Sequence, residues 1–110
     1  MQAAAAAERR AARLQELEQK IRDELPEAVR QVLRLTQVLN SAPEDREREC
    51  RQELALAAHR LRGRAASLQL SVLCAAAGAV ERLSATSASP VTLGAAAASC
   101  ERALAGAPTP

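Results

Sequence analysis

The 110-residue sequence predicts an all-α fold: a long antiparallel helical hairpin with a short third helix, packed as a coiled-coil-like three-helix bundle. Residues that favour helices, above all Ala, Leu, Glu, Gln and Arg, make up most of the chain. Apolar residues recur at intervals of three and four, which is the period of one helix face. No segment alternates apolar and polar residues in the manner of a half-buried strand.

The first helix is expected over residues 3–39. The apolar positions of its first half recur at three and four: Leu14, Leu17 and Ile21. The stripe then steps by four to Leu25, and such a step shifts a buried stripe around the helix axis. Pro26 follows directly; it lacks a backbone N–H and clashes with the preceding turn. The sequence therefore predicts a kink near residue 26 or the start of a new helix there.

The second helix is expected over residues 43–83. Ser41 and Glu44 have the spacing of a capping box, and Pro43 falls in the first turn, where a missing N–H matters little. Two glycines interrupt the apolar pattern that follows. A break into two helices at Gly63 is the alternative to one continuous helix.

This second helix is expected to carry two apolar rows on different sides. The main row is spaced by fours and threes: Leu54, Ala58, Leu61, Ala65, Leu68, Val72, Ala75 and Ala79. The second row has similar spacing: Leu56, His59, Gly63, Ala66, Leu70, Leu73, Ala77 and Val80. A helix with two apolar sides must be covered twice, so the rows predict a neighbour on each side.

The third helix is expected over residues 90–105. Ser89 is placed to cap its beginning, and Pro90 suits the first helical position because its missing N–H has no helical partner there. Gly106 suits the left-handed conformation that ends many helices.

The chain is expected to form one helical domain over residues 13–105. It is preceded by a frayed Ala- and Arg-rich helical start at residues 1–12 and followed by a disordered tail at residues 106–110. The core is thin, because the chain has 27 Ala, only 22 Leu, Ile and Val together, and no aromatic residue. Since an alanine buries little apolar surface, such a chain gains stability by burying further area against another protein.

Antiparallel packing of the first two helices is expected to set Leu14 and Leu17 beside residues 66–69. The third helix is then too short to cover the earlier half of the second row. We predict that this half binds a helix of another chain, through contact residues and a rim of arginines: Leu56, His59, Gly63 and Ala66 for contact, and Arg60, Arg62 and Arg64 for orientation. The alternative is a solvated basic patch beside acids of the first helix: Glu16, Glu18, Asp23 and Glu24. The apolar stripe of the first helix is the second candidate surface.

Catalysis, metal binding and cofactor binding are not indicated by any motif. His59 lies among arginines, with no arrangement typical of a hydrolytic triad. Cys50, Cys74 and Cys100 are too far apart in sequence to suggest a zinc site, and no glycine-rich phosphate loop is present. A net charge of +2 and the lack of aromatic residues do not indicate a nucleic-acid-binding protein.

The sequence thus predicts a non-catalytic helical subunit or adaptor that binds helices of partner proteins within a larger intracellular complex. The assembly would be a hetero-complex or a homo-oligomer. The alternative is a peripheral membrane protein whose amphipathic helices lie in the interface. No secretory signal is recognisable, so the cytoplasm or the nucleus is expected. Arg9, Arg10 and Arg13 leave a mitochondrial presequence as a further alternative.

Overall fold

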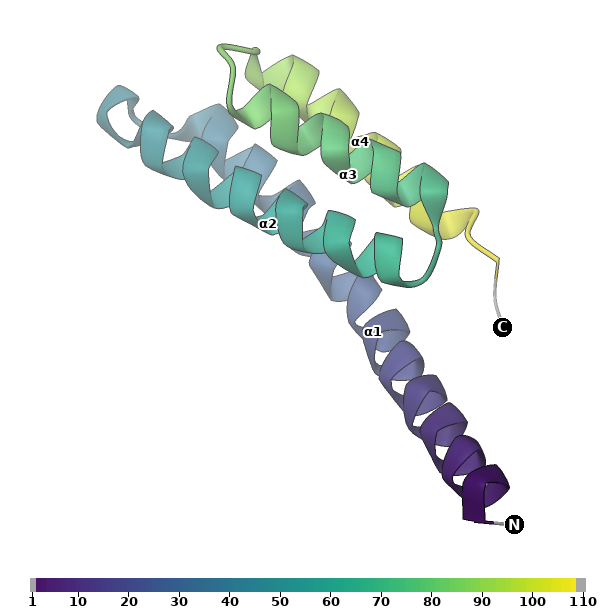
Figure 1. Ribbon diagram of the computed structural model, residues 1–110. Helices are drawn as coiled ribbons and strands as arrows, with labels where there is room; N and C mark the ends of the chain where they lie inside the picture. Colours follow the sequence, from purple (N-terminus) through teal and green to yellow (C-terminus); the bar gives the residue numbers. More distant parts are fainter. Residues whose placement is uncertain (1, 109–110) are drawn as a thin grey trace.

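The computed structural model describes residues 2–108, and this part of the chain is all-α, with four α-helices (Figure 1). The elements follow one another as α1 (Gln2–Ser41), the 3-10 turn η1 (Glu44–Arg46), α2 (Glu47–Ser67), α3 (Ser71–Ser84) and α4 (Pro90–Ala105). Each helix packs against the next in sequence, and α4 returns to pack against α1. The all-α class is confirmed, whereas the prediction of three helices is wrong, because the expected second helix is two helices.

The break that separates α2 from α3 lies at residues 68–70. The N–H of Leu70 donates to the carbonyl oxygen of Ala65 at 2.9 Å, and the N–H of Gln69 donates to that of Ala66 at 3.0 Å. Gln69 has a φ of 57°, in the left-handed region. These are the two hydrogen bonds and the backbone conformation of a Schellman helix end, here formed without glycine. The chain turns back at this point, so a continuous helix over residues 43–83 is wrong. The alternative break at Gly63 is also wrong, since α2 runs through Gly63.

Each of the two apolar rows is buried on only one side of this break. The first row is buried along α2, through Leu54, Ala58, Leu61 and Ala65. On α3 the same row turns outward, and Val72 is 72% exposed. The second row does the reverse: it is exposed along α2 and buried at Leu70 and along α3, through Leu73, Ala77 and Val80. The segment with two apolar sides therefore folds back on itself at the break. One row is buried along α2 and the other along α3, so no helix is covered on both sides by these rows.

Of the helix-end structures predicted from the sequence, the one at the start of α4 is formed and two others are not. Ser89 caps α4, because its hydroxyl oxygen accepts the N–H of Thr92 at 3.2 Å, with Pro90 in the first turn. The capping box predicted at Ser41 is not formed: Ser41 belongs to α1, and α2 begins only at Glu47, after a 3-10 turn. Gly106 has a φ of −90°, so the predicted left-handed helix end is wrong there.

The loop between α3 and α4 is held by one arginine of α2. Arg51 donates to the carbonyl oxygens of Thr86 at 3.2 Å and Ala88 at 2.6 Å, and it pairs with Glu47 at 3.1 Å. Its side chain is only 14% exposed. The carbonyl oxygens of Thr86, which is exposed, and of Ala88, which is partly buried, thus both accept from one guanidinium. Arg51 therefore ties the α3–α4 hairpin to α2.

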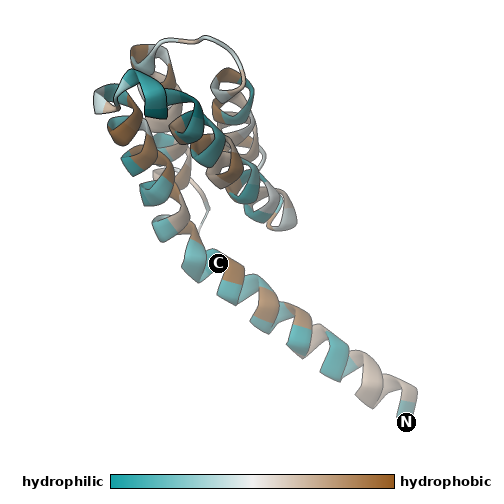
Figure 2. Ribbon diagram, turned by 90° about the vertical axis from the view of Figure 1, so that its left-hand side faces the viewer, coloured by the Kyte–Doolittle hydropathy of each residue, from teal (hydrophilic) through white to brown (hydrophobic). Residues whose placement is uncertain are grey.

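The two halves of α1 have different surroundings. From Leu25 onward its apolar stripe belongs to the core, through Leu25, Val29, Val32, Leu35 and Leu39. Before Leu25 the helix leaves the bundle, so that the molecule measures 64 × 26 × 19 Å (Figure 1). Figure 2 shows the helix axis changing direction where it leaves the bundle. Pro26 lies inside α1, next to Leu25, the first core residue of the helix. We call residues 2–24 the arm.

The expected position of the arm is wrong. Leu14 and Leu17 do not lie beside residues 66–69, because α2 ends at Ser67 and the arm extends past this end of the bundle (Figure 1). Fraying at the start of the chain remains a prediction; in the structure α1 begins at Gln2. Of the predicted tail, residues 109–110 lie outside the described residues. Ala107 packs partly against the core.

Candidate protein-interaction surface

The arm presents an apolar stripe that no other part of the described chain covers. Leu14 is 57% exposed and Leu17 is 52% exposed, although leucine side chains at this spacing are typical of a buried helix face. Ile21 is half-buried at the base of the arm. In Figure 2 apolar segments alternate with hydrophilic ones along the arm up to the bundle. The stripe is thus an amphipathic face without a partner.

The exposed stripe continues into the buried stripe of the same helix. Its positions follow the heptad spacing of four and three: Ala3, Ala7, Arg10, Leu14, Leu17 and Ile21. One step of four leads from Ile21 to Leu25, the first residue of α1 that is buried in the core. Since α2 and α4 cover α1 beyond this point, the arm extends an established helix–helix interface past the end of its partners.

Charges along the arm are divided between its two halves. The outer half, residues 2–13, has Glu8 and three arginines, a net charge of +2. The inner half, residues 14–24, has four acids against Lys20 and Arg22, a net charge of −2. Within residues 2–108 none of the three outer arginines forms an ion pair. The arm is therefore neutral as a whole and polarised along its axis.

The predicted contact residues of α2 lie on its outer side. Leu56 is 49% exposed, and His59, Gly63 and Ala66 are exposed as well. A Cβ atom at Gly63 would meet nothing within 4 Å, so no packing inside the molecule requires a glycine there. These residues share one face, but only Leu56 among them is a large apolar side chain.

The basic residues of α2 point to its two neighbours. Arg62 and His59 both pair with Glu81 of α3, at 2.9 and 2.8 Å. Arg64 pairs with Glu24 of α1 at 3.3 Å. Arg60 is exposed, with no ion pair within the described part of the chain. The alternative of a basic patch beside acids of the first helix therefore holds only for Arg64 with Glu24. Within the described residues no ion pair joins Glu16, Glu18 or Asp23 to α2, and the acid beside His59 and Arg62 belongs to α3.

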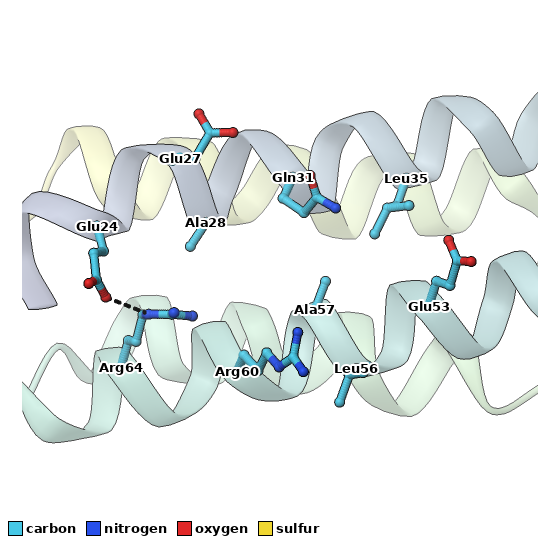
Figure 3. A pocket seen from close by; sticks show the side chains of 10 residues that line it. All are labelled: Glu24, Glu27, Ala28, Gln31, Leu35, Glu53, Leu56, Ala57, Arg60 and Arg64. Atoms are coloured by element: carbon cyan, nitrogen blue, oxygen red, sulfur yellow. Dashed lines mark hydrogen bonds and ion pairs between the residues drawn. The ribbon is translucent and has the colours of Figure 1, made fainter.

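A shallow groove of about 530 Å³ runs between α1 and α2 (Figure 3). Ala28 and Leu35 point into it from α1 and Ala57 from α2, while Leu56 points away from α1. Charged residues form its edges: Glu24, Glu27, Glu53, Arg60 and Arg64. Its floor is small and its walls are charged, so it offers less apolar surface for a partner than the arm does.

No family model, curated protein or solved structure matches the chain. Residues 2–108 contain no group of three or more His, Cys, Asp or Glu side chains placed to hold a metal ion. Among the described helices, none is both long enough and apolar enough to cross a bilayer.

Proposed function

We propose that the chain is a non-catalytic helical subunit that binds helices of other protein chains, with the arm as its principal contact. The observation that carries the proposal is the apolar stripe of Leu14, Leu17 and Ile21, which continues the core stripe of α1 beyond the end of α2. The outer face of α2, from Leu56 to Ala66, was the first surface predicted from the sequence and is proposed here as a secondary contact.

The free energies involved favour an arm that is covered in use. Full burial of a leucine side chain stabilises a protein by about 1.5–3 kcal/mol, and both leucines of the arm are more than half exposed. Most helical stability in proteins comes from packing of an amphipathic face rather than from helix propensity, and the face of the arm is unpacked. A partner helix on the stripe would supply the apolar burial that the bundle gives to the other half of α1.

The arm favours a protein partner over a lipid surface. Helices that lie in a membrane interface generally have a strongly cationic polar face and bulky apolar anchors. The arm instead has five acids and five bases, and the chain has no aromatic residue. Mixed charges beside an apolar stripe are typical of helices that pair with other helices.

In-cell crosslinking of the full chain tests the proposal. Wild type is compared with Leu14→Glu/Leu17→Glu and with Val38→Glu, a control at an apolar residue of similar exposure (46%) in the bundle half of α1. We expect wild type and the control to form the same crosslinked adducts and the double variant to lose them, with all three melting alike as judged by circular dichroism. Adducts that persist in the double variant would contradict the proposal. So would stripe-dependent flotation of the pure chain with anionic vesicles, which would favour the membrane alternative.

A further inference from the structure

We infer that the stripe of the arm is covered by the arm of a second copy of this chain, lying antiparallel to it about a twofold axis. The inference rests on the proposed function and names the partner of the same surface. An antiparallel pair is isologous: each arm gives the other the same contacts that it receives, so the assembly closes as a dimer.

The charge distribution of the arm is self-complementary only in this orientation. Antiparallel pairing sets the outer half, with a net charge of +2, against the inner half of the other copy, with −2. Parallel pairing in register would set +2 against +2 and −2 against −2. Charges that flank a helix pair determine the orientation and the choice of partner, so this polarity favours the antiparallel dimer.

Side-chain size, like charge, differs between the outer and inner halves of the arm. The outer half carries small residues at Ala3 and Ala7, and the inner half carries Leu14, Leu17 and Ile21. An antiparallel pair places large side chains opposite small ones at both ends, which fills the interface evenly. A parallel pair would leave alanine opposite alanine along the outer half and bury little apolar surface there.

Arg10 supplies the register. It is the one charged residue at a stripe position between Ala3 and Ile21. With Arg10 opposite Leu14 of the other copy, Ala7 lies opposite Leu17 and Ala3 opposite Ile21, and Arg10 is within one helical turn of that copy's Glu18. The aliphatic stem of Arg10 would cover the leucine while the guanidinium reaches an acid. A single charged residue in an apolar seam commonly fixes the register of a helix pair.

The bundle itself excludes a parallel pair. The stripe of the arm and the buried stripe of α1 are continuous, and α2 and α4 occupy the space over the buried part. A second α1 running parallel along the arm would continue into α2 and α4. An antiparallel arm instead brings its outer half to the end of the bundle, where α1 is no longer covered.

An apolar groove lies at that end of the bundle. It has a volume of about 330 Å³ and lies between the start of α3 and the end of α4, lined in part by Leu70, Val72, Ala103 and Pro108. Arg22 of the arm reaches the carbonyl oxygen of Pro108 at 3.5 Å, so the groove adjoins the base of the arm. The alanine-rich outer half of a second arm has side chains small enough to approach this surface closely.

Sedimentation equilibrium and small-angle X-ray scattering of the full chain test the inference. Wild type is expected to form a dimer at micromolar concentration. Its maximum dimension should be roughly 90 Å, since two molecules 64 Å long overlap along arms of about 36 Å. Leu17→Glu should raise the dissociation constant by on the order of 100-fold, because two charges enter one seam, while Val38→Glu, at an exposed apolar residue of the bundle, leaves it unchanged. A monomer at 100 µM (roughly the upper end of affinities relevant to a stable dimer), or a compact dimer with both bundles at one end, would overturn the inference.

Charge reversal tests the orientation independently. Arg10→Glu/Arg13→Glu turns the outer half to −2, and Glu16→Arg/Glu18→Arg turns the inner half to +2. Each variant alone should be monomeric, because both halves then carry one sign, whereas a 1:1 mixture and the fourfold variant should dimerise. Self-association of either double variant as strong as that of wild type would contradict the inference.

The two proposals can fail separately. A pure chain that is monomeric, while crosslinked adducts in cells still require Leu14 and Leu17, overturns self-pairing and leaves the proposed function standing. Loss of both the dimer and the stripe-dependent adducts overturns both proposals.

Discussion

The two halves of α1 carry one apolar stripe in two environments. From Leu25 onward the stripe is buried by α2 and α4, and before Leu25 it faces solvent. The difference is not one of apolar spacing, which is alike on both sides. It arises from the turn at Gln69, which ends α2 level with the base of the arm. A periodic stripe therefore shows that a helix face needs cover, and only the lengths of the neighbouring helices show whether the chain supplies it.

The strongest test of this difference between the two halves of α1 is to truncate one leucine of the stripe in each half. Leu25→Ala removes a side chain that is 1% exposed and should lower the free energy of unfolding by about 2–5 kcal/mol. Leu17→Ala should change it by less than about 0.5 kcal/mol when the chain is dilute and monomeric, because no packing is lost. Urea unfolding followed by circular dichroism measures both values. Equal losses would mean that the arm packs against its own bundle.

Removal of the Arg51 side chain should give the next largest effect. Arg51→Ala leaves the carbonyl oxygens of Thr86 and Ala88 without their donor, so we expect a loss of about 1–3 kcal/mol. Arg60→Ala, at an exposed arginine of the same helix, should have an effect within about 0.5 kcal/mol. Hydrogen exchange in residues 84–90 should increase only in the first variant; unchanged exchange there would show that Arg51 does not hold the loop.

Replacement of Gln69 by glycine should stabilise the turn that ends α2 and so sets how much of α1 is covered. Gln69 has a positive φ, which costs a residue with a side chain about 1 kcal/mol or more, so Gln69→Gly should stabilise the bundle by up to about 1 kcal/mol. The matched control is Gln52→Gly in the middle of α2, which should destabilise by about 1 kcal/mol. Thermal unfolding should therefore shift in opposite directions for the two variants, and a shift in the same direction would contradict the helix end assigned to Gln69.

The smallest expected effect is a pH dependence that belongs to the bundle alone. Burial raises the pKa of the Cys100 thiol to about 11, from an ordinary value of 9.0. A raised pKa means that the unfolded chain loses this proton first, so its contribution to stability is complete below pH 9 and declines as the pH rises towards 11. Urea midpoints of wild type should fall more steeply over this range than those of Cys100→Ser. Parallel curves would show that the thiol does not titrate differently on folding.

Local sequence signals were sufficient where one or two residues determine the structure. Ser89 and Pro90 indicate the start of α4 because a capping hydroxyl and a proline act within one turn of the helix. The end of α2 gave no such signal, since Gln69 adopts the left-handed conformation that glycine usually takes. Two apolar rows were visible in the sequence, but a folded-back pair of helices and a helix covered on both sides give the same pattern until the turn is known.

The sequence predicted that an apolar helix stripe would bind a partner, but it did not predict which stripe is left uncovered. The stripe of Leu14, Leu17 and Ile21 is evident from spacing alone, whereas its exposure depends on where α2 ends. The contacts of Glu81 with His59 and Arg62 need the α2–α3 hairpin, which brings together residues about 20 positions apart. Sequence spacing cannot reveal contacts that a turn without a recognisable signal creates.

Hydrogen exchange of the full chain at low and high concentration tests the central claim most directly. The arm amides should exchange rapidly in a dilute sample and become protected as the concentration rises, while residues 25–41 stay protected throughout. Leu17→Glu should abolish the gain in protection. An arm that is equally protected at every concentration, in wild type and in Leu17→Glu, would contradict the claim that its stripe is free to bind another chain.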